Sequence, residues 1–79
     1  PIFWVLQVAT LGSERRANEI VEALRDRGYK AFVSRYTRVD EALFRVQIGP
    51  NAQMDPLARI KPEIDRVLSV DSQILRYTQ

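Results

Sequence analysis

The fold is decided by the stretch Phe44-Arg45-Val46-Gln47-Ile48-Gly49-Pro50, which alternates apolar and polar side chains. Successive side chains of an extended strand point to opposite faces, so Arg45 and Gln47 would share one face and the apolar residues the other. Gly49-Pro50 is a typical turn dipeptide and predicts that the strand stops there. The stretch therefore predicts a strand with one core face and one face that can serve recognition.

The chain has 79 residues, with 46% hydrophobic and 28% charged residues. These values are ordinary for globular proteins, and a chain of this length buries about 60% of its unfolded surface. We therefore expect residues 1–79 to form a single domain. Because the chain begins with Pro1 and contains no run of about 18 apolar residues, we expect it to be excised from a larger protein whose anchor lies elsewhere.

The first half of the chain predicts a strand, a helix and a second strand. Residues 3–10 are rich in aromatic and β-branched residues and predict a central strand. Residues 14–27 repeat apolar residues at helical spacing, with Ser13 as the N-terminal cap and Gly28 as the C-terminal stop. A second strand is expected at 29–36, but its pattern does not reveal which face is core.

The second half predicts a hairpin followed by a helix and a last strand. The polar residues 37–42 predict a longer loop to the third strand at 43–48. Asp55 and Pro56 predict a helix start, with Asp55 as cap and Pro56 at the first position, and the apolar pattern runs to about residue 69. Pro62 should kink or loosen this helix. Residues 73–78 close the chain as a fourth strand.

This order of elements predicts an α+β fold with a four-stranded antiparallel sheet and two helices on one face, the βαββαβ arrangement of RNP and ferredoxin-like domains. The other face of the sheet is then open. Alternation places two polar sets side by side on this open face, because the first and third strands are both central. The predicted open-face residues are Val5, Gln7, Ala9, Leu43, Arg45 and Gln47.

Several kinds of chemistry are excluded by composition. The sequence has no cysteine and no histidine, which removes thiolate and imidazole metal ligands, cysteine nucleophiles and histidine bases. Asp40 and Glu41 are adjacent in sequence, so their side chains would diverge rather than flank a glycosidic bond. The three glycines stand alone and form no phosphate loop. We expect neither catalysis nor a metal or cofactor.

A basic stripe offers an alternative function. Residues 27–39 contain four basic residues and no acid, whereas the rest of the chain has eight bases and ten acids. Such a stripe could bind nucleic acid or another protein, or it could simply protect a sheet edge. RNA recognition motifs share the element order, but their base-stacking aromatics are absent from the Arg45 face. Phe32 and Tyr77 could substitute in part.

Three stretches resemble the SPOR domain, the sporulation-related repeat. They are Trp4-Val5-Leu6-Gln7-Val8, the helix end Leu24-Arg25-Asp26-Arg27-Gly28-Tyr29, and the stretch from Phe44 to Pro50. The resemblance covers nearly the whole chain. Through the tail Leu75-Arg76-Tyr77-Thr78 it is most similar to cell-division proteins of the DedD type.

The resemblance implies a binding module without catalysis. SPOR domains bind septal peptidoglycan and prefer glycan strands without stem peptides. They usually form the periplasmic end of proteins anchored in the bacterial inner membrane. The implied partner is therefore denuded peptidoglycan, with other division proteins reached through the parent chain, and neither nucleic acid nor membrane contact is expected for the domain itself.

The same resemblance implies a site on the open face. Some family members carry tryptophan where this chain has Leu43, so a ring that could stack on a sugar is absent at that position. The family also often has glycine and an aromatic residue after the strand-one glutamine, where this chain has Ala9 and Leu11. Together with the alternation, the predicted glycan-binding residues are Gln7, Thr10, Phe32, Leu43, Arg45, Gln47 and Leu75.

Overall fold

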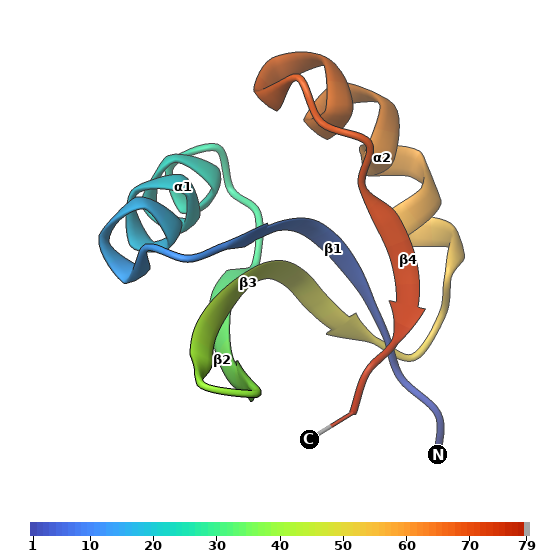
Figure 1. Ribbon diagram of the computed structural model, residues 1–79. Helices are drawn as coiled ribbons and strands as arrows, with labels where there is room; N and C mark the ends of the chain where they lie inside the picture. Colours follow the sequence, from blue (N-terminus) through green and yellow to red (C-terminus); the bar gives the residue numbers. More distant parts are fainter. Residues whose placement is uncertain (79) are drawn as a thin grey trace.

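The computed structural model of the protein describes residues 1–78 as an antiparallel sheet in the order β2-β3-β1-β4. Both helices lie on one side of the sheet (Figure 1). The predicted α+β fold and element order are confirmed. The elements are β1 (Trp4–Leu11), α1 (Glu14–Asp26), β2 (Ala31–Arg38), β3 (Glu41–Asn51), α2 (Asp55–Leu68) and β4 (Gln73–Arg76).

Helix α1 begins and ends at the predicted signals. The Ser13 side chain accepts a hydrogen bond from the Arg16 backbone N–H at 3.2 Å, and Gly28 adopts a φ of +90° that favours glycine. The Tyr29 N–H donates to the Leu24 carbonyl at 3.1 Å. Tyr29 therefore caps the helix, and this is why β2 begins at residue 31 instead of the predicted residue 29.

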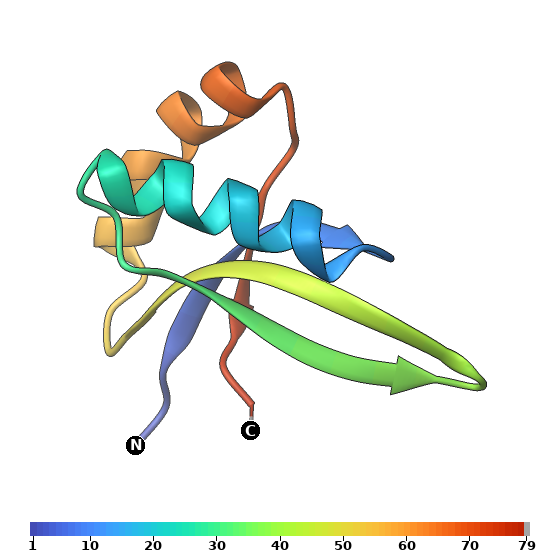
Figure 2. The same cartoon turned by 90° about the vertical axis from the view of Figure 1, so that its left-hand side faces the viewer.

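The loop predicted at 37–42 is wrong. Strand β2 continues to Arg38 and β3 starts at Glu41, so only Val39 and Asp40 connect them. Val39 adopts a φ of +55°, a conformation that a β-branched residue rarely takes. A run of polar residues therefore forms the extended end of a hairpin, which projects beyond α1 (Figure 2).

Strand β3 does not stop at Gly49-Pro50 as predicted but continues to Asn51. Gly49 has a φ of +125°, and a Cβ atom at this position would lie 3.1 Å from the Trp4 carbonyl oxygen. Glycine lets the two strands approach closely at a register irregularity opposite β1. The dipeptide marks a bulge inside the strand rather than its end.

Helix α2 differs from the prediction at its start and around its proline. Met54 is the N-cap without a side-chain hydrogen bond, and Asp55 is the first helical residue rather than the cap. Its carboxylate still suits the positive end of the helix dipole. The helix runs unbroken through Pro62, which is exposed to solvent. It ends at Leu68, because Ser69 turns into the left-handed conformation.

The core lies between the sheet and the two helices. Ala31 and Val33 belong to it, which settles the face of β2 that the pattern left open. Strand β4 is shorter than the predicted 73–78 and ends at Arg76. None of the helices in residues 1–78 is long and apolar enough to cross a membrane. The main core side chains are Leu6, Val8, Ala17, Val21, Leu24, Ala31, Phe44, Val46, Ile48, Leu57 and Ile64.

A second bulge, in β1, changes which residues share the open face. Gln7 is in register with Gln47, but Ala9 is in register with Val46 and therefore faces the core. Val8 is the extra residue, and it is also buried in the core. The prediction that Ala9 lies on the open face is wrong, because the bulge interrupts the alternation on which it rested.

Candidate functional site

The open face of the sheet carries polar residues in rows that cross its strands. In one row Arg45 of β3 lies between Thr10 of β1 and Ser34 of β2. The bulge at Val8 makes this row possible, since residues 7 and 10 of a regular strand would point to opposite faces. The guanidinium donates hydrogen bonds and the two hydroxyl groups both donate and accept them, so the row offers donors and acceptors across three strands.

The neighbouring row is built from carboxamides. Gln7 is in register with Gln47 on one side and with Gln73 of β4 on the other. The Gln47 Nε2 group donates to Gln7 Oε1 at 3.2 Å, and only 7% of Gln47 is exposed. Gln47 therefore helps to position the Gln7 side chain. The two polar sets that alternation predicted side by side therefore meet through Gln7 and Gln47, and not through Gln7 and Arg45.

An aromatic ring missed by the sequence analysis completes the site. Tyr36 of β2 lies directly opposite Leu43 of β3, and the Arg45 guanidinium carbon lies 3.7 Å from the centre of the Tyr36 ring. This stacking fixes the orientation of the guanidinium and leaves its N–H groups to donate along the face. A two-residue hairpin turn would have predicted this register, and with it an aromatic residue beside Leu43.

The opposite end of the open face is apolar. The rings of Phe32 and Tyr77 meet edge to face with centroids 6.2 Å apart. Phe32 lies on the edge strand β2, and Tyr77 directly follows β4 at the other edge of the sheet. Val5, which lies on this face in register with Leu75, is only 1% exposed. Both helices of residues 1–78 lie on the other side of the sheet, so the side chains of the open face itself enclose this end of it.

All seven residues predicted to bind glycan lie on the open face, and six of them are on the three adjacent strands β2, β3 and β1. Leu75 is set apart from the polar rows, on the short strand β4. Leu43 and Arg45 lie beside Tyr36, Thr10 is in register with Arg45, and Gln7 belongs to the neighbouring row. Contact of any of these residues with a glycan stays a prediction.

A cavity of about 240 Å³ opens beside the polar rows, where β4 joins β1. Gln7, Thr10 and Gln73 supply amide and hydroxyl groups to its wall, and Asp71 supplies a carboxylate. Because β4 pairs with β1 only as far as Gln7, the cavity also borders the backbone of the bulge. The arrangement can bind a polar group that both donates and accepts hydrogen bonds.

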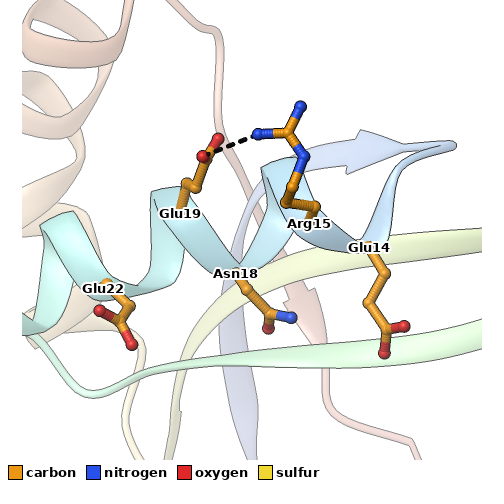
Figure 3. Close-up of a pocket in the computed structure, with 5 residues that line it drawn as sticks. All are labelled: Glu14, Arg15, Asn18, Glu19 and Glu22. Atoms are coloured by element: carbon orange, nitrogen blue, oxygen red, sulfur yellow. Dashed lines mark hydrogen bonds and ion pairs between the residues drawn. The ribbon is translucent and has the colours of Figure 1, made fainter.

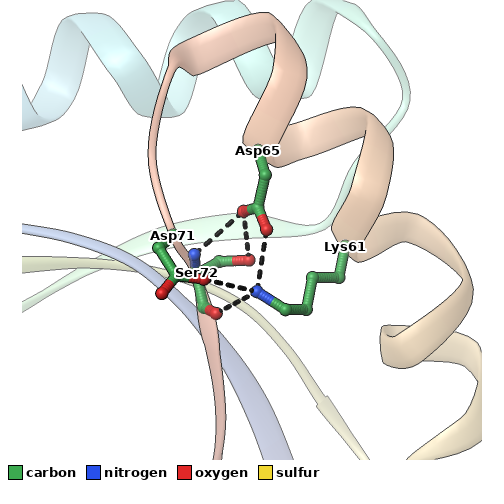
Figure 4. A network of polar contacts seen from close by, with 4 residues as sticks. All are labelled: Lys61, Asp65, Asp71 and Ser72. Carbon is green, nitrogen blue, oxygen red and sulfur yellow. Dashed lines mark hydrogen bonds and ion pairs between the residues drawn. The ribbon is translucent and has the colours of Figure 1, made fainter.

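A polar network fixes the segment that leads into β4 (Figure 4). Lys61 of α2 donates to Asp65 at 2.7 Å, to Asp71 at 3.1 Å and to the Ser72 carbonyl oxygen. Asp65 also accepts hydrogen bonds from the Ser72 hydroxyl at 2.6 Å and from its backbone N–H at 2.9 Å. These partners, Lys61 first, lower the pKa of the Asp65 carboxyl to about 2. The network holds Asp71 at the cavity.

A larger hollow, of about 450 Å³, lies on α1 and is not part of this site. Figure 3 shows Arg15 paired with Glu19 on one side of the helix, while Glu14, Asn18 and Glu22 point the other way. Its lining consists of exposed side chains of this one helix. Nothing from the sheet contributes, so we assign it no binding role. Within residues 1–78 no cluster of acidic side chains could hold a metal ion.

Solved structures of similar fold were identified by comparison. The SPOR domain of RlpA from Pseudomonas aeruginosa superposes with a TM-score of 0.77 over 95% of this chain and 99% of that one, at 22% identity. The peptidoglycan-binding domain of the B. subtilis cell wall lytic enzyme CwlC gives a TM-score of 0.73 over 99% of this chain and 92% of that one, at 14% identity. At these identities the two structures establish the fold alone.

Sequence comparisons go further. The cell division protein DedD of Escherichia coli K12 is 31% identical over 75 residues, which are 95% of this chain and 34% of that protein. The chain thus spans about a third of DedD. A solved DedD structure gives a TM-score of 0.68 at 30% identity over 98% of this chain and 40% of that one. The family profile described as SPOR domain matches residues 1–54. The chain belongs to the SPOR domain family.

Proposed function

We propose that this domain binds peptidoglycan through the polar rows of its open face and thereby targets its parent protein to the cell-division site. The carrying observation is the Arg45 guanidinium, which is stacked on Tyr36 and flanked by Thr10 and Ser34. Sugars present hydroxyl and acetamido groups that need both donors and acceptors, and these four side chains offer both. The domain acts by binding and not by catalysis.

The preferred ligand is a glycan strand without stem peptides. Tyr36 supplies an aromatic ring beside Leu43. Arg45 stacks on one face of this ring, and the opposite face can pack against the apolar side of a pyranose ring. The row of Gln7 and Gln73 and the cavity beside it extend the site along the sheet toward β4. A linear glycan that crosses the strands would meet these groups in succession.

The relatives support the wider biological setting of this proposal. DedD is named as a cell division protein and the CwlC domain as a peptidoglycan-binding domain. We accordingly place residues 1–79 as a single domain of a larger, inner-membrane-anchored bacterial protein. It would act in the periplasm at the septum, where the parent chain could meet other division proteins.

Sedimentation with purified sacculi tests the proposal. The domain should pellet with sacculi, and amidase pretreatment, which removes stem peptides, should increase the bound fraction. Arg45→Ala should lose most of the binding while its unfolding free energy falls by no more than about 2 kcal/mol, the range of a lost stacking contact on Tyr36. Arg76→Ala is the matched control, because Arg76 is exposed but belongs to the other face of the sheet.

Two outcomes would contradict the proposal. One is the absence of binding to either preparation of sacculi. The other is a collapse of the fold in Arg45→Ala, which would make Arg45 structural. The nucleic-acid alternative is tested by measuring binding of a single-stranded oligonucleotide beside sacculi at the same ionic strength. Salt dependence alone does not distinguish the two ligands, because amidase leaves a carboxylate on each muramic acid and the glycan is then also an anion.

A further inference from the structure

Strand β2 forms a long unpaired edge of the sheet. It has eight residues and pairs only with β3, whereas β4 at the other edge has four. Its distal part lies beyond the helices in the projecting hairpin (Figure 2). An edge strand presents backbone N–H and C=O groups that can pair with another chain.

The register identifies which groups are free. The Gly49 N–H donates to the Lys30 carbonyl at 3.0 Å, so Lys30 and every second residue after it direct their backbone groups to β3. The residues between them point outward. Arg25 of α1 donates from Nε to the outward Ala31 carbonyl at 2.9 Å and closes that end of the edge. The stretch left for pairing is Val33 to Thr37.

The two charged residues of β2 are basic and lie on its opposite faces, while the acids Asp40 and Glu41 belong to the turn and to β3. Arg35 is in register with the core residue Phe44, and Arg38 is in register with Glu41 across the open-face side. Both arginines are exposed, and neither makes an ion pair within residues 1–78. A polyanion lying flat on one face would meet only one of them. A strand added at the edge would pass between them and meet both.

We propose that the outer edge of β2, from Val33 to Thr37, docks an extended acidic peptide segment of a partner protein as a fifth strand. The backbone of the segment bonds to the outward groups of Val33, Arg35 and Thr37, and its acidic side chains lie beside Arg35 and Arg38. A second copy of the domain would bring like charges together at the same edge, so the arginines select against self-pairing and favour an acidic partner.

This edge is separate from the proposed glycan site. Arg45 and Thr10 lie on central strands and use their side chains, whereas the docking edge uses outward backbone groups of β2. Peptide docking would add a strand beside Tyr36 without covering Arg45. The inference therefore does not depend on the proposed glycan function, and the two can fail independently.

The test uses two synthetic peptides, one of Val-Glu-Glu repeats and one of Val-Lys-Lys repeats, so that charged side chains fall on both faces of the added strand. Fluorescence anisotropy should show binding of the Glu peptide, and the Lys peptide should bind at least about tenfold more weakly. Hydrogen exchange should slow at the Val33, Arg35 and Thr37 amides when the Glu peptide is bound. Arg45→Ala should leave this binding unchanged.

Two variants of the domain sharpen the result. Thr37→Pro removes an outward N–H but no hydrogen bond to β3, so the Glu peptide should bind more weakly, while Thr37→Val should bind normally. Arg35→Glu combined with Arg38→Glu should reverse the preference between the peptides. Arg15→Glu, on the exposed surface of α1, is the charge control. If Thr37→Pro does not fold, the peptide preference of the double variant Arg35→Glu/Arg38→Glu still tests the proposal.

The proposal is overturned if neither peptide binds, if both bind equally, or if protection appears away from β2. A further contrary result is that the double variant Arg35→Val/Arg38→Val self-associates and the wild-type domain binds no peptide. The two arginines would then serve only to prevent pairing between sheet edges. A single-stranded oligonucleotide that slows exchange at the same amides would assign the edge to nucleic acid instead.

Discussion

The two faces of β3 are almost equally buried at their centres but are built from different interactions. Phe44 on the helix side and Gln47 on the open side each expose 7% of their surface. Phe44 packs in the apolar core, whereas Gln47 donates a hydrogen bond to Gln7. The open face is therefore not a loose collection of solvated polar groups. Its side chains are held in place, as a binding surface requires.

This comparison predicts that stability and recognition can be separated by substitutions on opposite faces. The largest effect is expected on the helix side. Leu6→Ala removes a side chain with no exposed surface and should cost about 2–5 kcal/mol of unfolding free energy, measured by urea denaturation. Leu43→Ala, on the open face, should cost less. A larger loss in Leu43→Ala would mean that the open face carries the stability.

The second largest effect on stability is expected at the bulge in β3 that contains Gly49 and lies opposite β1. Gly49→Ala forces a side chain into a φ of +125° and against the Trp4 carbonyl oxygen, which should destabilise the fold by about 1–3 kcal/mol. Gly12→Ala is the control, because no atom lies within 4 Å of the position of its Cβ. Thermal unfolding of both variants measures the difference, and equal midpoints would show that the close approach is unimportant.

The hydrogen bond between the Gln7 and Gln47 carboxamides should stabilise the open face. A double-mutant cycle of Gln7→Ala and Gln47→Ala should give a coupling free energy of about 0.5–1.5 kcal/mol, the net value of a protein hydrogen bond. We also expect Gln47→Ala to reduce binding to sacculi, because Gln7 loses its orientation. Strictly additive losses of unfolding free energy would show that the two side chains do not stabilise each other.

The smallest expected effect is a pH dependence that belongs to neither face. The Asp65 pKa of about 2 lies below its ordinary 3.8, so the carboxylate stabilises the folded state above about pH 4, and this contribution disappears as the pH falls through about 2. Asp65→Asn should flatten the dependence of the urea midpoint on pH in this window. Asp40→Asn, in the exposed hairpin turn, should leave the dependence in place.

Local patterns were sufficient to predict the elements and the two faces of β3. Ser13 and Gly28 mark the ends of α1 because capping depends on neighbouring residues. The alternation around Arg45 and Gln47 likewise reflects local geometry. These signals carry the fold class, since the order of elements leaves few ways to cover one face of a four-stranded sheet.

The register could not be predicted, and the missed part of the site follows from it. The bulge at Val8 arises from pairing between β1 and β3, which are distant in sequence. Val39 gave no turn signal, because β-branched residues disfavour its φ of +55°. Without the position of the turn, the pairing of Tyr36 with Leu43 could not be predicted. Thr10 was proposed from the family resemblance, and only the bulge explains how it shares a face with Gln7.

The contact between Phe32 and Tyr77 has a consequence for access. Phe32 lies on the edge strand β2 and Tyr77 directly follows β4 at the other edge, so their contact at 6.2 Å reaches across the two central strands. Val5 lies beneath this end of the face and is only 1% exposed. The aromatic pair therefore closes this end of the open face to a ligand, and entry to the polar rows is left to the end where Arg45 and Thr10 lie.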